Sequence, residues 1–149
     1  MTDEAEAQDP RPERILPEEV DFDPETFTPE RAEAALASGI ELFNAGDYHA
    51  AHEEFERCWL ANEAGDADFY KGLIQASICL HHLTRRNAEG ARKLYAGHRR
   101  LLGTFLPSHR GVDVAALLAD MQRALQPVLR GADRGDMDPA PRLVPSETA

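Results

Sequence analysis

Hydrophobic residues recur every three or four positions along most of this chain, a spacing typical of amphipathic helices. Thr28 and Pro29 are residue types preferred at a helix start, so a first helix is predicted from there to about Ala45, where Gly46 ends it. Four more helices are predicted, over residues 48–62, 67–85, 88–105 and 112–125. No segment has the alternating pattern of a strand, and the chain is therefore expected to be all-α.

Polar residues and prolines support these boundaries. Asp47 and Asn87 precede the second and fourth predicted helices, where a side-chain oxygen can accept from the first free backbone N–H groups. Pro107 and Pro127 follow the fourth and fifth predicted helices, and a residue without a backbone N–H is expected to end each of them.

A repeated pattern relates the first two helices to the next two. Ala51 and Phe55 have the spacing of a tetratricopeptide hairpin, in which a small residue and an aromatic four positions later pack the second helix onto the first. A weaker copy, 40 residues later, has Ala91 and Tyr95 at these positions. Two units are too few for a solenoid. The expected fold is a compact bundle of about five helices, built from two tetratricopeptide-like hairpins and a C-terminal helix.

The chain of 149 residues is expected to hold one helical domain, over residues 28–130. Residues 1–27 are acidic, rich in Pro and Glu and poor in hydrophobics, so a mostly disordered arm is expected there. Residues 131–149 contain three prolines and few apolar residues, which predicts a flexible tail. Within this tail, residues 139–143 have the alternative of lying extended over the domain.

Charge is distributed unevenly along the chain. The net charge is −11, and residues 1–30 hold eleven acidic residues against two arginines. Such acidity argues against bulk affinity for nucleic acid or for an anionic membrane, and neither partner is expected. A basic run before and along the fourth helix has two interpretations: a patch for phosphate or an acidic partner, or a solvated face. It comprises Arg85, Arg86, Arg92, Lys93, Arg99 and Arg100, of which the last four lie on the helix.

Cysteine usage and hydropathy indicate a soluble, cytoplasmic protein. Cys58 and Cys79 lie inside apolar helical patterns and are interpreted as small buried hydrophobes, not as a disulfide or a metal site. The longest apolar run, residues 72–80, is interrupted by Gln75 and Ser77 and is too short to span a bilayer. The acidic, polar N-terminus does not resemble a signal peptide.

Polar side chains interrupt the apolar faces of the second and third predicted helices. His52 falls inside the apolar stripe of the second helix, and Glu56 lies one step from it. Gln75 and His82 are seven residues apart on the third helix, so they project in nearly the same direction. Such groups are costly to bury unless they are hydrogen-bonded or coordinated. We therefore expect one polar cluster at the seam between these two helices, drawn from His52, Glu53, Glu56, Gln75 and His82.

These residues also resemble a known family. The string Phe43-Asn44-x-Gly46-x-Tyr48-x-x-Ala51-His52-Glu53-x-x-Glu56-x-x-Trp59 is similar to a signature of the domain of unknown function 309 family. So are Gly72-Leu73-Ile74-Gln75-Ala76, His82 and Asn87-x-x-Gly90-Ala91. The resemblance covers about residues 30–130 and implies a small all-helical domain without an established activity. The characteristic polar positions of the family correspond to His52, Glu53, Glu56, Trp59, Gln75, His82 and Asn87. His49 and His81 depart from the family pattern.

Three kinds of chemistry fit this cluster. His52-Glu53-x-x-Glu56 is similar to a zinc-protease helix with its second histidine replaced by glutamate, and His82 could complete a two-histidine, one-carboxylate set for a divalent metal. In an internal network, His52 and Glu56 would pair and hold Gln75. In a small-ligand or acid–base site, Glu53 or Glu56 would serve as base and His82 as acid.

Two functions follow from these alternatives. The first is a binding or assembly module for a small molecule or a protein, self-association included, because helical repeats routinely carry binding. The second is a small metal-dependent or acid–base enzyme, similar to a hydrolase, that uses the cluster. Trp59 is either a binding platform or part of the core. We favour the binding module, because no Ser or Cys is placed as a nucleophile and nothing in the sequence supplies a reaction.

Overall fold

Amphipathic segments bounded by capping residues form the helices of the computed structural model, which describes residues 28–61 and 65–146. The acidic arm predicted at residues 1–27 lies outside the described residues. The described part of the chain contains α2 (Pro29–Asn44), α3 (Tyr48–Ala61), α4 (Ala67–Thr84), α5 (Ala88–Gly103) and α6 (Val114–Leu129). The prediction of an all-α bundle is confirmed.

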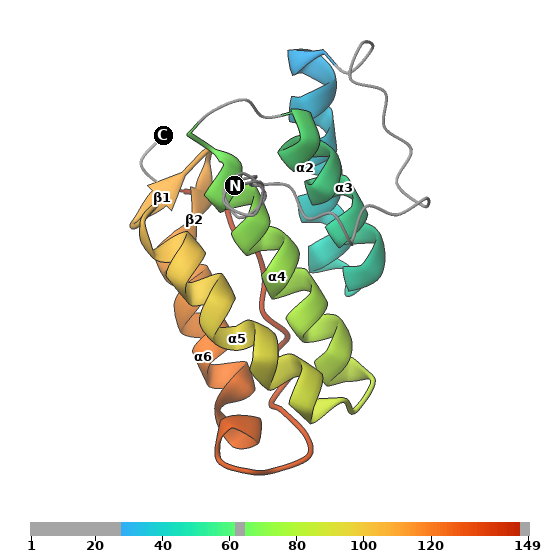
Figure 1. Ribbon diagram of the computed structural model, residues 1–149, viewed down its shortest axis with the longest axis vertical. Helices are drawn as coiled ribbons and strands as arrows, with labels where there is room; N and C mark the ends of the chain where they lie inside the picture. The colour runs from blue at the N-terminus through green and yellow to red at the C-terminus, as the bar shows by residue number, and fades with distance from the viewer. Residues whose placement is uncertain (1–27, 62–64, 147–149) are drawn as a thin grey trace, which may run out of the picture.

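Each helix packs mainly on its neighbours along the chain, and α4 lies between α3 and α5 (Figure 1). Gly39 of α2 lets the ring of Phe55 on α3 approach closely, because a Cβ at Gly39 would lie 2.5 Å from Phe55 Cε1. This is the close packing of one helix on the next that the repeat predicted. The largest side chains with less than 2% of their surface exposed form the core: Trp59, Phe43, Phe55, Phe69, Leu73, Ile74, Leu80, Leu102, Leu117, Met121 and Leu125.

The capping residues act as the sequence predicted. The Asp47 carboxylate accepts from the N–H of Ala50 at 3.3 Å, and the Asn87 side-chain oxygen accepts from the N–H of Gly90 at 3.0 Å. Each oxygen therefore satisfies a backbone donor in a first helical turn. Gly46, just after α2, has a φ of +88°, a left-handed conformation that favours glycine.

The chain between α5 and α6 forms a small antiparallel hairpin that the sequence analysis did not predict. Its strands are β1 (Ser108–His109) and β2 (Val112–Asp113), with Ser108 opposite Asp113 and His109 opposite Val112. Strands of two residues are too short to show an alternating pattern. Consequently α6 begins at Val114, two residues later than predicted.

Helix α6 also ends later than predicted, because it continues through Pro127 to Leu129. Pro127 lacks the N–H that would donate to the carbonyl four residues earlier, so it removes one backbone hydrogen bond from the last turn. Leu125 and Val128 are fully buried, so the last turn keeps its apolar face in the core. Here tertiary packing outweighs the local preference of proline to end a helix.

Residues 131–146, the described part of the C-terminal tail, run back along the bundle, in red in Figure 1. Only 2% of the Leu143 surface is exposed, and the Asn44 side chain of α2 hydrogen-bonds to the backbone of Leu143. The extended alternative considered for residues 139–143 therefore describes this segment. Among the described helices, none combines the length and the hydropathy needed to cross a membrane.

Candidate functional site

One face of α3 carries a row of buried polar and amphipathic side chains. His52, Glu56 and Trp59 are four and then three residues apart, so they share a helix face. Their exposed fractions are 7%, 0% and 1%. Helix α4 packs against α3.

Two pairs of side chains fix how α4 runs past this face. The rings of His49 and His81 are 5.6 Å apart between centroids, and the Lys71 ammonium lies 5.9 Å from the centre of the Trp59 ring. In each pair the two residue numbers add to 130, as expected where two helices of equal rise per residue run antiparallel. This register places Glu56 opposite Ile74 of α4, the residue before Gln75.

Glu56 is a buried carboxyl group to which no described residue donates a hydrogen bond. Neither of its oxygens has a hydrogen-bond partner among residues 28–61 and 65–146. Burial raises the pKa of Glu56 from an ordinary value of 4.5 to about 7, and the negative charge of Glu53 adds to this increase. Near neutral pH the group therefore exists in both its neutral and its ionised form.

Gln75 extends the buried polar region toward α5. A Cβ at Gly97 of α5 would overlap Gln75 Oε1, so this carbonyl lies directly against the α5 backbone. Gln75 Oε1 has no hydrogen-bond partner in the described part of the chain, and the same holds for Trp59 Nε1. Within the described residues, α3 and α4 thus carry three unpartnered acceptor oxygens, two on Glu56 and one on Gln75, and one unpartnered donor on Trp59.

His82 also faces α5. It lies two turns after Gln75 on α4, closer to the loop between α4 and α5. Its ring lies against Gly90, and its Nδ1 is 3.2 Å from Nδ2 of Asn87. The sequence analysis correctly placed Gln75 and His82 in one direction, since the two glycines they contact are also seven residues apart. It assigned that direction to the second helix, whereas the structure turns both side chains toward α5. Because α4 is apolar on both sides, periodicity could not distinguish its two neighbours.

Four histidines form a continuous row where α3 begins and α4 ends. Ring centroids are 4.9 Å apart for His49 and His52, 5.6 Å for His49 and His81, and 6.2 Å for His81 and His82. The His52 Nδ1 lies 2.6 Å from the His49 carbonyl, and the His49 Nδ1 lies 3.8 Å from a carboxylate oxygen of Glu53. Burial lowers the pKa of His81, and the charges of His49, Arg85, His82 and His52 lower it further.

Sequence reasoning treated His49 and His81 only as departures from a family pattern. Their proximity could have been inferred, because a helical hairpin brings the start of one helix beside the end of the next. Despite this clustering, the described residues contain no group of three or more His, Cys, Asp or Glu side chains that could hold a metal ion. In this geometry His52, Glu56 and His82 do not fit the two-histidine, one-carboxylate metal set.

The basic residues of α5 divide into two groups. Arg92 donates to the carbonyl of Val128 at 3.0 Å, and Arg99 donates to the carbonyl of Leu118 at 2.9 Å. Both guanidinium groups therefore attach α5 to the backbone of α6. Lys93 and Arg100 are exposed, as are Arg85 and Arg86 before the helix. The predicted basic patch is thus partly a structural contact between helices.

A second polar group, which the sequence analysis did not single out, joins the hairpin to the start of α4. His109 Nε2 lies 2.7 Å from Asp66 Oδ1, and Arg110 donates to the other oxygen of Asp66. The His109 ring packs against Phe69 and Phe105, with centroids 4.8 and 4.5 Å away. Partial burial acts to raise the pKa of Asp66, but these two donors hold it below its usual value.

Comparison with known proteins identifies the segment that carries the candidate site. Residues 36–94 match the model of a family described as "Domain of unknown function (DUF309)". The chain is 30% identical over 95 residues to the "Uncharacterized protein YpuF" of Bacillus subtilis (strain 168), an alignment that includes 60% of this chain. The chain spans about half the length of this curated relative, 53%. The resemblance to the domain of unknown function 309 family is thereby confirmed for residues 36–94, which include His52, Glu53, Glu56, Trp59, Gln75 and His82.

Proposed function

We propose that this domain is a helical binding module whose ligand is a small organic cation with N–H donors, received between α3 and α4 beside Glu56. One observation carries this proposal: Glu56 is fully buried, and neither carboxylate oxygen has a hydrogen-bond partner among the described residues. Burying such a group without a partner is costly, and proteins normally avoid it. A ligand that supplies the missing donors accounts for its position.

The other unpartnered atoms indicate the chemistry of the ligand. Gln75 Oε1, on the neighbouring helix α4, is a third acceptor without a partner, whereas Trp59 Nε1 is the only unpartnered donor on α3 and α4 within the described chain. Ammonium and guanidinium groups are rich in donors and carry the charge that an ionised carboxylate needs. The Trp59 ring already has the Lys71 ammonium 5.9 Å away, so its surroundings accept a positive charge.

The proposed pairing is sensitive to pH. A cation binds the ionised form of Glu56, whose pKa burial raises to about 7. Protons compete with the cation below that value. We therefore expect affinity to be highest above pH 7 and to fall about tenfold for each pH unit below it.

Calorimetric titration tests the proposal with three amines, ethylamine, putrescine and agmatine, and with alcohols of matching size. We expect at least one amine to bind at pH 8, and the Glu56→Gln variant to lose about tenfold or more in affinity. Glu54→Gln is the matched control, because Glu54 lies on the same helix and pairs with Arg57 at 3.1 Å. Amines that bind no better than the alcohols, or equally well to the Glu56→Gln variant, would contradict the proposal.

An acid–base enzyme is a second candidate, favoured by the neighbouring carboxyl groups of Glu53 and Glu56. A group with a pKa near 7 can both donate and accept a proton at neutral pH. Hydrolysis of p-nitrophenyl esters by the same two variants distinguishes this candidate. Turnover that is lost in Glu56→Gln and kept in Glu54→Gln favours the enzyme, whereas equal rates in both variants exclude Glu56 as its acid–base group.

A further inference from the structure

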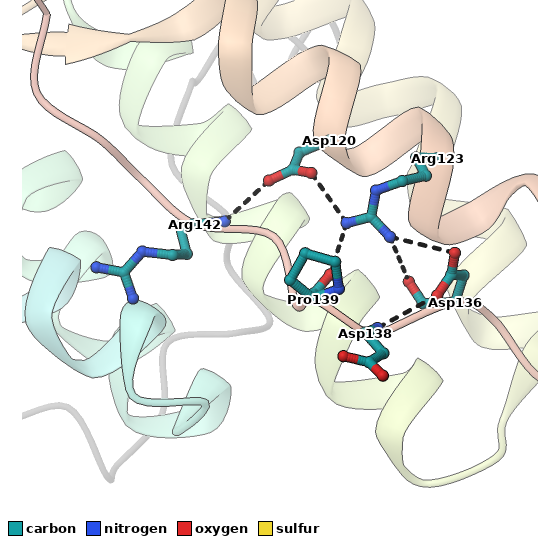
Figure 2. A network of polar contacts seen from close by, with 6 residues as sticks. All are labelled: Asp120, Arg123, Asp136, Asp138, Pro139 and Arg142. Carbon is teal, nitrogen blue, oxygen red and sulfur yellow. Dashed lines mark hydrogen bonds and ion pairs between the residues drawn. The ribbon is translucent and has the colours of Figure 1, made fainter.

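The C-terminal segment 139–146 packs against α2, α6 and the β-hairpin, and its hydrogen-bond partners there define the groove that holds it: Asn44, Asp120, Gly111 and Asp113. Within the segment, Pro141 and Leu143 are buried, while Arg142 and Pro145 are exposed. The segment runs extended beside α6 and reaches the hairpin, as Figures 1 and 2 show. Two buried side chains therefore anchor a strand-like peptide.

The groove binds this segment mainly through its backbone. The Asn44 side chain donates to the Leu143 carbonyl at 2.9 Å and accepts from the Leu143 N–H at 2.7 Å. Asp120 accepts from the backbone N–H of Arg142 at 3.3 Å. A single amide that pairs with both backbone groups of one residue recognises an extended peptide whatever its side chains.

The end of the segment extends the small sheet. The N–H of Asp113 donates to the Val144 carbonyl at 3.0 Å, and the N–H of Ser146 donates to the Gly111 carbonyl at 2.9 Å. Val112 and Pro145 form an antiparallel bridge between these bonds. Addition of a strand to a sheet edge, combined with a pocket for one side chain, is a recurring mode of peptide recognition.

Arg123 of α6 fixes the point where the segment enters the groove (Figure 2). Its guanidinium donates to the carbonyls of Asp136 at 3.1 Å and Pro139 at 2.6 Å. It also pairs with the carboxylates of Asp120 at 2.9 Å and Asp136 at 3.3 Å. Arg123 therefore retains the chain's own segment next to α6.

We propose that this groove is an interaction surface that accepts residues 139–146 of a second copy of this chain, by exchange of C-terminal segments. The contacts depend on the backbone and on Pro141 and Leu143, so the same segment of another copy meets all of them. The connection 131–135 contains no helix or strand, and it includes Gly131 and Gly135. This proposal is independent of the proposed function, because it rests on a different surface.

The linkage within one chain favours the closed monomer. A short connection gives the segment an effective concentration of about millimolar order at its own groove. Exchange between copies is therefore expected to increase with protein concentration, and to dominate when the connection is too short to turn back. Removing residues 132–134 from the full-length chain creates the second condition.

Light scattering of this deletion variant tests the exchange. We expect a dimer in which the Leu143 amide is as protected from hydrogen exchange as in the unaltered protein. The same deletion combined with Asn44→Ala and Leu143→Asp removes the clamp and the anchor, and is expected to be monomeric. A folded deletion variant that stays monomeric at millimolar concentration, with the Leu143 amide unprotected, overturns the proposal.

A second measurement applies if the deletion prevents folding. A fluorescent peptide of residues 136–146 is titrated into the full-length Leu143→Asp variant, whose own segment has lost its anchor. We expect saturable binding that weakens about tenfold when Asn44→Ala is added. Absence of saturable binding up to about 1 mM peptide would overturn the proposal, because that is the order of the effective concentration within the chain.

Discussion

Two acidic residues of this protein show how partners determine the ionisation of a buried carboxyl. Asp66 receives hydrogen bonds from His109 and Arg110, and its pKa is below the usual value. Glu56 has no hydrogen-bond partner within residues 28–61 and 65–146, and its pKa is raised to about 7. Burial acts to raise the pKa of both groups, more completely for Glu56, but only Asp66 has donors that lower it again. The ionised form of Glu56 therefore destabilises the folded protein.

The Glu56→Gln variant is expected to reveal this instability as a function of pH. Below pH 4.5 the carboxyl is protonated in both the folded and the unfolded chain. Between pH 4.5 and about 7 it ionises only in the unfolded chain, so the free energy of unfolding falls as pH rises, by about 3 kcal/mol in all. Urea unfolding should show the variant gaining this amount over the unaltered protein across that interval. A constant difference between the two would contradict the raised pKa.

At the scale of the helices, two glycines test how tightly the elements pack. A Cβ at Gly39 would lie 2.5 Å from the fully buried ring of Phe55, so Gly39→Ala is expected to cost about 2 kcal/mol of unfolding free energy. A Cβ at Gly97 would meet only the end of the flexible Gln75 side chain. Since alanine favours a helix, Gly97→Ala is expected to change stability by less than about 1 kcal/mol. Thermal unfolding of the two variants tests whether Gly39→Ala loses more stability than Gly97→Ala. Equal losses of stability would contradict this expectation.

The elements could be predicted where local chemistry decides them. Asp47 and Asn87 cap helices as residue type indicated, and α2 to α5 begin at the predicted residues. Two features depend on contacts between distant residues, and local chemistry alone could not decide them. Pro127 remains helical because Val128 is buried, and the tail is ordered along the bundle by Asn44.

The candidate site could be predicted as a set of residues but not as an arrangement. Helical spacing correctly indicated that His52 and Glu56 are buried, and that Gln75 and His82 share a direction. It could not decide whether that direction led to α3 or α5, since both pack against α4. The choice depends on Gly90 and Gly97, whose missing side chains leave room on α5.

At the scale of the whole molecule, a second buried group opposes the effect of Glu56. His98 is fully buried, and burial lowers its pKa from an ordinary value of 6.5 to about 4. The carbonyls of Leu94 and Tyr95 offset this shift in part, but neither ring nitrogen makes a hydrogen bond of normal geometry within the described residues. As pH falls from 6.5 to 4, the unfolded chain takes up a proton that the folded chain excludes. His98 therefore lowers the free energy of unfolding by about 3 kcal/mol in all as pH falls from 6.5 to about 4.

The two groups should nearly cancel between pH 4.5 and 6.5, where Glu56 lowers stability with rising pH and His98 raises it. We expect the free energy of unfolding of the unaltered protein to be almost constant there. Glu56→Gln alone should make it rise with pH, and His98→Leu alone should make it fall. The double variant should restore a flat profile, because effects of groups without shared partners add. Urea unfolding of the four proteins at several pH values tests this, and two single variants with slopes of the same sign would show that one of the two pKa shifts has the wrong direction.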